Sequence, residues 1–247
     1  MKHHRFCFIL LLSVLFFSCR GGPRNAPASG AEFSSYTVKK TITAPEKRGK
    51  LSVSLTLLAV PDRAGLSSLL REILYEGMDP DQYANGLIAS LEKQAAGMDK
   101  NADASGQEWE YMEEFSALGE TSDPDVLVIS RVRYYYLGGA NGMQEKKYFP
   151  VSRSRAARVL LGEFVEPAKN GELAVLIEDA LRRYAGLEPG APLTEGGFFE
   201  NKLEKAPDNF YPARDGLVFA WDFYEIAPRS MGPIEVTIPW EKLRPLR

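Results

Sequence analysis

Residues 125–142 read DVLVISRVRYYYLGGANG, and this stretch carries the clearest structural pattern in the chain. Its first part, Asp125 to Tyr136, is rich in β-branched and aromatic residues, which predicts a β-strand. The glycine-rich corner GGANG predicts a tight turn, because adjacent glycines supply the positive φ angles that such turns need. A second strand, EKKYFPV, is predicted from Glu145 to Val151. The stretch therefore predicts two strands joined by a turn.

The sequence on either side supplies further strands and a few helices. Strands are predicted where apolar and polar residues alternate, and helices where apolar residues recur on one helical face. The predicted strands are residues 36–43, 50–60, 108–115, 216–226 and 234–240, and the predicted helices cover residues 66–74, 173–184 and a segment that starts at Asp79-Pro80. Helices and strands come in clusters rather than in strict alternation. We therefore expect an α+β fold of antiparallel sheets with helices packed on one face.

The N-terminal sequence MKHHRFCFILLLSVLFFSC has the pattern of an export signal. A basic start precedes an apolar run from Phe6 to Phe17, which is too short to span a bilayer as a helix. The run ends in a small residue and Cys19, which resembles the cleavage box of bacterial lipoproteins; an ordinary secretory signal is the alternative. We expect residues 1–18 to be a lipoprotein signal peptide, Cys19 to carry the lipid, and residues 19–35 to be a flexible tether.

The histidine and cysteine content limits the kinds of catalytic and metal site that the mature chain can contain. The chain has two histidines and two cysteines, and His3, His4 and Cys7 would all leave with the signal. The mature chain would then hold no histidine and no disulfide, which excludes Ser-His-Asp triads, histidine bases and zinc sites built on imidazole. The net charge of −3 gives no broad attraction to nucleic acid, so we expect no nucleic-acid partner.

The glycine corner does not have the spacing of a phosphate-binding loop. GGANG matches neither GxGxxG nor GxxxxGK[ST], and no basic residue follows it directly. A purely structural turn is one interpretation. The other concerns the tyrosines before it: on a strand, Tyr134 and Tyr136 point to one face and Tyr135 to the other. One face can belong to the core, or its rings can stack on sugars or anchor a protein partner.

Residues 99–110, DKNADASGQEWE, have the oxygen-ligand spacing of an EF-hand calcium loop. Ala104 stands where that loop needs glycine for its sharp turn, and Gly106 stands where an apolar residue is usual. A solvated polar loop is therefore the alternative to calcium, and no other cofactor is expected. The candidate ligands are Asp99, Asn101, Asp103, Ser105 and Glu110.

The acidic run within residues 108–114 offers a rival function. A glycosidase needs two carboxyl groups at a set separation across a cleft, and Glu108, Glu110, Glu113 and Glu114 are candidates for such a pair. Carboxylates this close on an alternating segment are more often a solvated sheet edge. A carboxylate-dependent hydrolase of cell-wall glycan is therefore the alternative to a protein without catalysis.

Two stretches resemble a known family. YYYLGGANG with the following YFPVSRSRAARVLLGEFV, and GLVFAWDFYEIAPRSMGPIEVTIPWEKL, are similar to the family-3298 domain of unknown function, which is the C-terminal part of RsiV-type anti-sigma factors. Asn141 stands where that family usually has histidine, and Arg229 where an aromatic residue is common. The stretch from Tyr36 to Tyr136 is similar in layout to the partner domain shared with PdaC-type peptidoglycan deacetylases. The matches to the Y-x-I-A-P-x-x-x-G pattern are Tyr224, Ile226, Ala227, Pro228 and Gly232.

The resemblance implies a β-grasp-like envelope module with two closely packed lobes, residues 36–140 and 141–247. RsiV-type proteins use this module to sense lysozyme by direct binding, and the deacetylases join it to a catalytic domain. We therefore expect a non-catalytic protein of the bacterial cell envelope, lipid-anchored to a membrane and facing the periplasm or the surface, that recognises lysozyme or a peptidoglycan-associated ligand. A structural or surface-antigen role is a third hypothesis. The ligand-binding candidates are Tyr134, Tyr136, Gly138, Gly139, Asn141 and Arg229.

Overall fold

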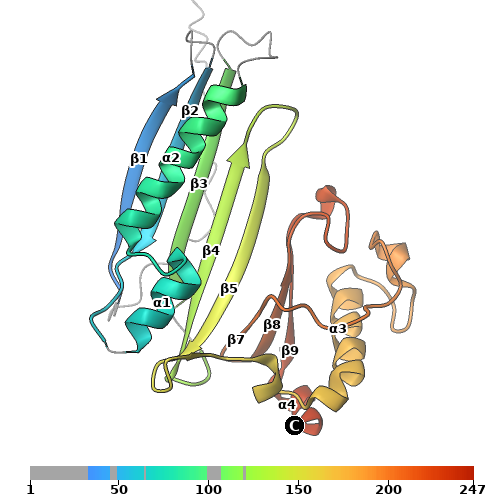
Figure 1. The fold of residues 1–247 in the computed structure, drawn as a ribbon. Helices are drawn as coiled ribbons and strands as arrows, with labels where there is room; N and C mark the ends of the chain where they lie inside the picture. The colour runs from blue at the N-terminus through green and yellow to red at the C-terminus, as the bar shows by residue number, and fades with distance from the viewer. Residues whose placement is uncertain (1–32, 45–48, 64, 99–106, 119–120) are drawn as a thin grey trace, which may run out of the picture.

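The structure is a computed structural model that describes residues 33–44, 49–63, 65–98, 107–118 and 121–247. Two sheets and several helices form two lobes in this part of the chain (Figure 1), which confirms the α+β class. The predicted signal peptide, Cys19 and residues 19–32 of the predicted tether lie outside the described residues. No helix within the described part is long and apolar enough to cross a membrane.

The N-terminal lobe is built on a six-stranded sheet in the strand order β1-β2-β3-β4-β5-β6. Every neighbouring pair is antiparallel except β2 and β3, which run parallel. The expectation of antiparallel pairing is wrong for this one pair, because a helical crossover returns the chain to the end at which β2 began. The strands are β1 (Ser35–Thr43), β2 (Gly49–Leu58), β3 (Gln107–Leu118), β4 (Val126–Tyr136), β5 (Met143–Ser152) and β6 (Ala157–Arg158).

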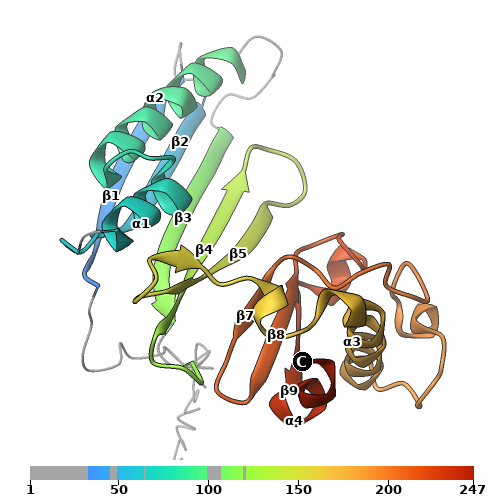
Figure 2. The same ribbon diagram turned by 60° about the horizontal axis from the view of Figure 1, so that its bottom comes forward.

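The crossover consists of α1 (Leu66–Tyr75) and α2 (Pro80–Met98), which cover one face of the sheet over β1 to β3 (Figures 1 and 2). Alternate side chains of β2, from Leu51 to Leu57, point to these helices and are at most 3% exposed. A buried leucine contributes roughly 1.5–3 kcal/mol of transfer free energy, so this face holds the lobe together. The hydroxyl of Tyr75 ties the end of α1 to β2, because it donates to the Leu58 carbonyl and accepts the Leu58 N–H.

The C-terminal lobe has a three-stranded antiparallel sheet of β7 (Phe210–Pro212), β8 (Gly216–Trp221) and β9 (Ile234–Pro239). Helix α3 (Asn170–Tyr184) packs its apolar stripe on one face of this sheet, and α4 (Trp240–Leu243) follows β9. The strand predicted for residues 216–226 ends at Trp221. Its continuation turns, with Tyr224 at a φ of 65°, a left-handed conformation that a strand does not use.

The two lobes join along β5. The side chains of Asn209 and Asp222 accept hydrogen bonds from the backbone N–H groups of Tyr148 (3.0 Å) and Lys146 (2.7 Å), so they occupy the free edge of that strand. Glu235 of β9 adds bonds to the Tyr148 hydroxyl (2.6 Å) and the Lys146 ammonium (3.0 Å). A small third core between the sheets contains Val126, Val128, Tyr148, Val159 and Ala220.

The expected division between residues 140 and 141 falls in the turn of the β4–β5 hairpin. Residues 126–135 of β4 pair with residues 143–152 of β5, so both strands belong to the N-terminal sheet. The sheet therefore places the division after β6. The reason is that cross-strand hydrogen bonding holds the hairpin in one sheet, whereas the chain after β6 leaves for the second core.

Candidate functional site

The six-stranded sheet has an outer face, turned away from α1 and α2. This face is open except at one end of β4 and β5, where Val126, Val128 and Tyr148 pack against the C-terminal lobe. Hydroxylated, charged and aromatic side chains alternate outward from four neighbouring strands. Tyr134 and Tyr136 of β4 lie on this face, directly opposite Met112 and Glu110 of β3. The other outward residues near them include Lys39, Thr41, Ser52, Ser54, Thr56 and Glu114, all partly or fully exposed.

The glycine corner is a turn against which both tyrosines pack. Gly138 and Gly139 each adopt a φ of 98°, and the Tyr136 hydroxyl donates to the Gly139 carbonyl at 2.9 Å. Gly142 lies beneath the Tyr134 ring, where any Cβ atom would overlap the ring atoms. The glycines are thus explained by backbone conformation and close approach. Asn141 is exposed in the same turn.

Arg229 reaches the base of this corner from the C-terminal lobe. Its guanidinium lies over the Phe223 ring at 4.4 Å from the ring centre, and Nη1 is 3.5 Å from the Sδ of Met143. Met143 pairs with Tyr135, so it lies on the helix-covered side of the sheet. The structure therefore brings Arg229 near the corner but on the opposite face from Tyr134 and Tyr136. The six candidate residues surround the corner without sharing one face.

The acidic run divides between the two faces of β3. Glu108, Glu110 and Glu114 are exposed on the outer face, whereas Glu113 points to the helix side and is 0% exposed. Same-face neighbours along a strand are about 6.6 Å apart, but these three lie along one strand of an open sheet rather than on opposite walls of a cleft. This geometry does not favour the hydrolase hypothesis.

Glu113, which the sequence suggested only as a candidate for a glycosidase pair, is the centre of a buried charged network. Its Oε2 accepts hydrogen bonds from the hydroxyls of Tyr83 (2.9 Å) and Tyr111 (3.2 Å), and its Oε1 lies 3.1 Å from Arg133 Nη2 and 3.7 Å from Arg131 Nε. Burial, and then the Glu113 charge, raise the pKa of Tyr83 and Tyr111 above the usual tyrosine range. Both phenols therefore stay protonated and keep donating.

A sequence signal for this network exists. Trp109, Tyr111 and Phe115 occupy alternate positions of β3 and are all buried, which places Glu113 on the same face. Burial acts to lower the pKa of Arg133, but the charge of Glu113 and its hydrogen bond to Arg133 outweigh burial and raise that pKa. The arginine therefore stays charged opposite the carboxylate.

The structure does not test most of the predicted calcium ligands. Asp99, Asn101, Asp103 and Ser105 lie outside the described residues, and Glu110 is an exposed residue of β3. Within the described ranges, no three acidic, histidine or cysteine side chains gather closely enough to hold a metal ion.

Comparison with known proteins places this chain beside a family of unknown function. Residues 164–241, most of the C-terminal lobe, match the model of the family described as "Protein of unknown function (DUF3298)". A search of curated proteins finds no match.

Solved structures of that family share the fold of both lobes. A DUF3298 family member from Bacteroides fragilis superposes with a TM-score of 0.71 at 20% identity, over 87% of this chain and 92% of its own. A DUF3298 family protein from Pseudomonas aeruginosa superposes with a TM-score of 0.60 at 17% identity, over 85% of this chain and 92% of its own. At these identities the likeness shows the fold alone.

Proposed function

We propose that this chain is a lipid-anchored binding protein of the bacterial cell envelope, without catalysis of its own, that recognises lysozyme or a peptidoglycan-associated ligand. The open outer face of the six-stranded sheet carries this proposal. Tyr134 and Tyr136 present two adjacent rings on it, held in place by the glycine corner. Rings of this kind stack on sugars and anchor protein partners at little conformational cost.

The surroundings of the two rings suit a binding surface. Glu110 and Glu114 supply acceptors, and the hydroxyls of Ser52 and Ser54 supply both donors and acceptors on the same face. A flat face of this kind can meet a macromolecule, whereas it lacks the enclosure that catalysis on a small substrate uses. The N-terminal sequence with Cys19 supports the lipid anchor.

The first test is a calorimetric titration with lysozyme of a chain that begins at Ala31. This chain keeps every described residue, including all of both large hydrophobic cores, since the first core starts at Phe33 and the second at Val165. We expect saturable binding, weakened about tenfold or more when Tyr134 and Tyr136 are both changed to serine, since buried aromatic anchors dominate interfaces. Tyr184→Ser, an exposed tyrosine on α3, is the matched control and should bind like the parent.

The outcomes separate the parts of the proposal. No heat with lysozyme, followed by saturable heat with muropeptides, would select the peptidoglycan arm. No heat with either would overturn the binding function. In the full chain, Cys19→Ser should move the protein from the membrane fraction to the soluble fraction, and unchanged membrane association would contradict the lipid anchor.

A further inference from the structure

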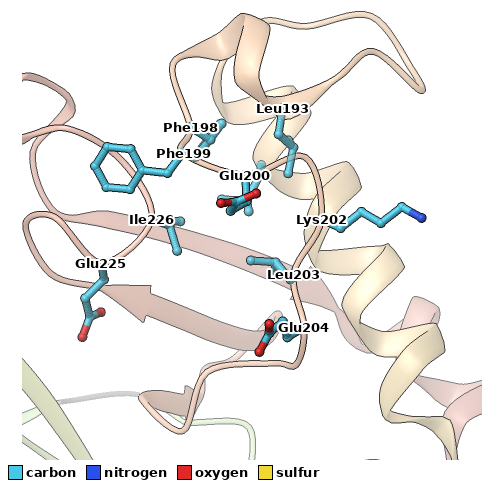
Figure 3. A pocket seen from close by; sticks show the side chains of 10 residues that line it. Leu193, Phe198, Phe199, Glu200, Lys202, Leu203, Glu204, Glu225 and Ile226 are labelled. Carbon is cyan, nitrogen blue, oxygen red and sulfur yellow. The ribbon is translucent and has the colours of Figure 1, made fainter.

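A hollow of about 100 Å³ opens in the C-terminal lobe, and none of its lining residues belongs to the six-stranded sheet (Figure 3). It lies between the end of α3, the segment of residues 193–204 and the turn that follows β8. Its floor is apolar: Leu181, Leu193 and Phe198 are 0%, 1% and 5% exposed. Leu203 and Ile226 close the sides.

The size of the hollow limits what it can hold. Pockets for cofactors and drug-sized ligands usually measure about 300–1,000 Å³, so this one is too small for them. An apolar cavity of roughly 150 Å³ accommodates a benzene ring. The hollow in this lobe is therefore of the right order for one aliphatic or small aromatic side chain.

Carboxylates surround the apolar floor. Glu200, Glu204 and Glu225 line the hollow, whereas the lining contains a single cationic residue, Lys202, whose ammonium points away from it in Figure 3. Glu225 is already engaged, since it accepts the backbone N–H of Asp222 at 2.8 Å. No described cation pairs with Glu200 or Glu204, so these two carboxylates are available to a ligand.

Phe199 extends the apolar surface beyond the hollow. Its side chain is 48% exposed, and Figure 3 places the ring on the side away from Lys202. The backbone holds it there, because the Phe199 N–H donates to the Ile226 carbonyl at 2.9 Å. A large exposed ring that the fold fixes beside an open apolar hollow is suited to contact a partner.

We propose that this hollow binds an apolar side chain flanked by lysine or arginine on a basic polypeptide. The apolar group fills the floor and contacts Phe199, while the flanking cations meet Glu200 and Glu204. The charge complementarity selects this occupant over an acidic or neutral segment. The site is separate from Tyr134 and Tyr136, so it does not depend on whether the outer sheet face binds lysozyme.

The test titrates three short peptides into the chain that begins at Ala31. Binding is monitored by the NMR signals of the backbone amides of Leu203 and Ile226. Acetyl-Lys-Leu-Lys-amide should shift these signals saturably, with a Kd of the order of 1 mM for so small a ligand. Acetyl-Glu-Leu-Glu-amide and acetyl-Lys-Gly-Lys-amide should bind at least several-fold more weakly, because each lacks one of the two recognised groups.

Variants locate the site. Glu200→Gln with Glu204→Gln should weaken the basic peptide about two- to tenfold, and Phe199→Ala should weaken it as well, with little effect on folding because all three side chains are exposed. Glu166→Gln with Glu241→Gln, two exposed residues outside the lining, is the charge-matched control and should bind like the parent. The proposal is overturned if the three peptides bind alike, if none binds, or if the control weakens binding as much as the pocket variants.

Discussion

Glu113 and Glu114 are neighbours in β3, yet they lie in opposite environments. Glu113 is 0% exposed, beneath Tyr83 of α2 and beside two arginines, whereas Glu114 is exposed on the open face. The strand places them on opposite sides, and the helical crossover covers only one of those sides. Neighbouring carboxylates in an acidic run can therefore have different roles. Here Glu113 belongs to the core, whereas Glu110 and Glu114 belong to the surface.

Removing the buried carboxylate should have the largest effect. Glu113→Ala should destabilise the protein by about 3 kcal/mol or more, because the buried hydroxyls of Tyr83 and Tyr111 would lose their acceptor and Arg133 would keep only Glu145, at 3.7 Å, as an ion-pair partner among the described residues. Glu114→Ala should change the free energy of unfolding by no more than about 0.5 kcal/mol. Urea unfolding of both variants measures the difference, and equal losses would show that the two faces do not differ as the structure indicates.

The second-largest loss of stability is expected from a substitution in the glycine corner. Gly142→Ala should cost about 1–3 kcal/mol, because the new Cβ overlaps the Tyr134 ring and one of them must shift. In a Tyr134→Ala background the same change should cost much less. Gly86→Ala in α2, where a Cβ meets nothing within 4 Å, should instead stabilise by about 0.5–1 kcal/mol. Thermal unfolding of Gly142→Ala, Tyr134→Ala, the double variant and Gly86→Ala measures these changes. If the losses at Gly142 and Tyr134 simply add, the contact between the two residues is contradicted.

The smallest effect on the free energy of unfolding is expected at Asp222, where the two lobes meet, and it depends on pH. Burial raises the pKa of Asp222, although the Lys146 N–H and the Lys147 charge oppose this. The folded state thus retains a proton that the unfolded chain has lost, so this residue's contribution to stability falls as pH rises from about 4 through its folded pKa.

Asp222→Asn should remove that dependence. Its stability relative to the parent should increase with pH over this window. Asp208→Asn, whose side chain is 94% exposed, is the control and should keep the pH profile of the parent. Parallel profiles for the parent and Asp222→Asn in urea unfolding from pH 3 to 7 would refute the assignment.

Much of the fold could be predicted because its signals are local. The alternation in residues 125–136 predicted β4 to within a residue, and the leucine stripe of residues 173–184 predicted most of α3. The short strands β6 and β7, with two and three residues, are too brief to show a period. The parallel pairing of β2 with β3 depends on how the crossover packs, which no local pattern records.

The candidate site was predicted less well. Tyr134 and Tyr136 do share an open face with Glu110, as strand alternation allows. Arg229 lies at the same corner on the other side of the sheet, because its position depends on how the C-terminal lobe docks on β5. The hollow beside Phe199 left no sequence signal, since its lining comes from α3, the segment of residues 193–204 and the turn after β8.

The sequence by itself determined the α+β class, the main strands and helices, and which side chains of each strand share a face. These follow from alternation and helical periodicity, which act over a few residues. Only the tertiary structure decided which carboxylate is buried, what covers the free edge of β5, and where an apolar hollow stays open. Each of these depends on groups far apart in the chain, such as Tyr83 with Glu113 and Lys146 with Asp222, that packing alone brings into contact.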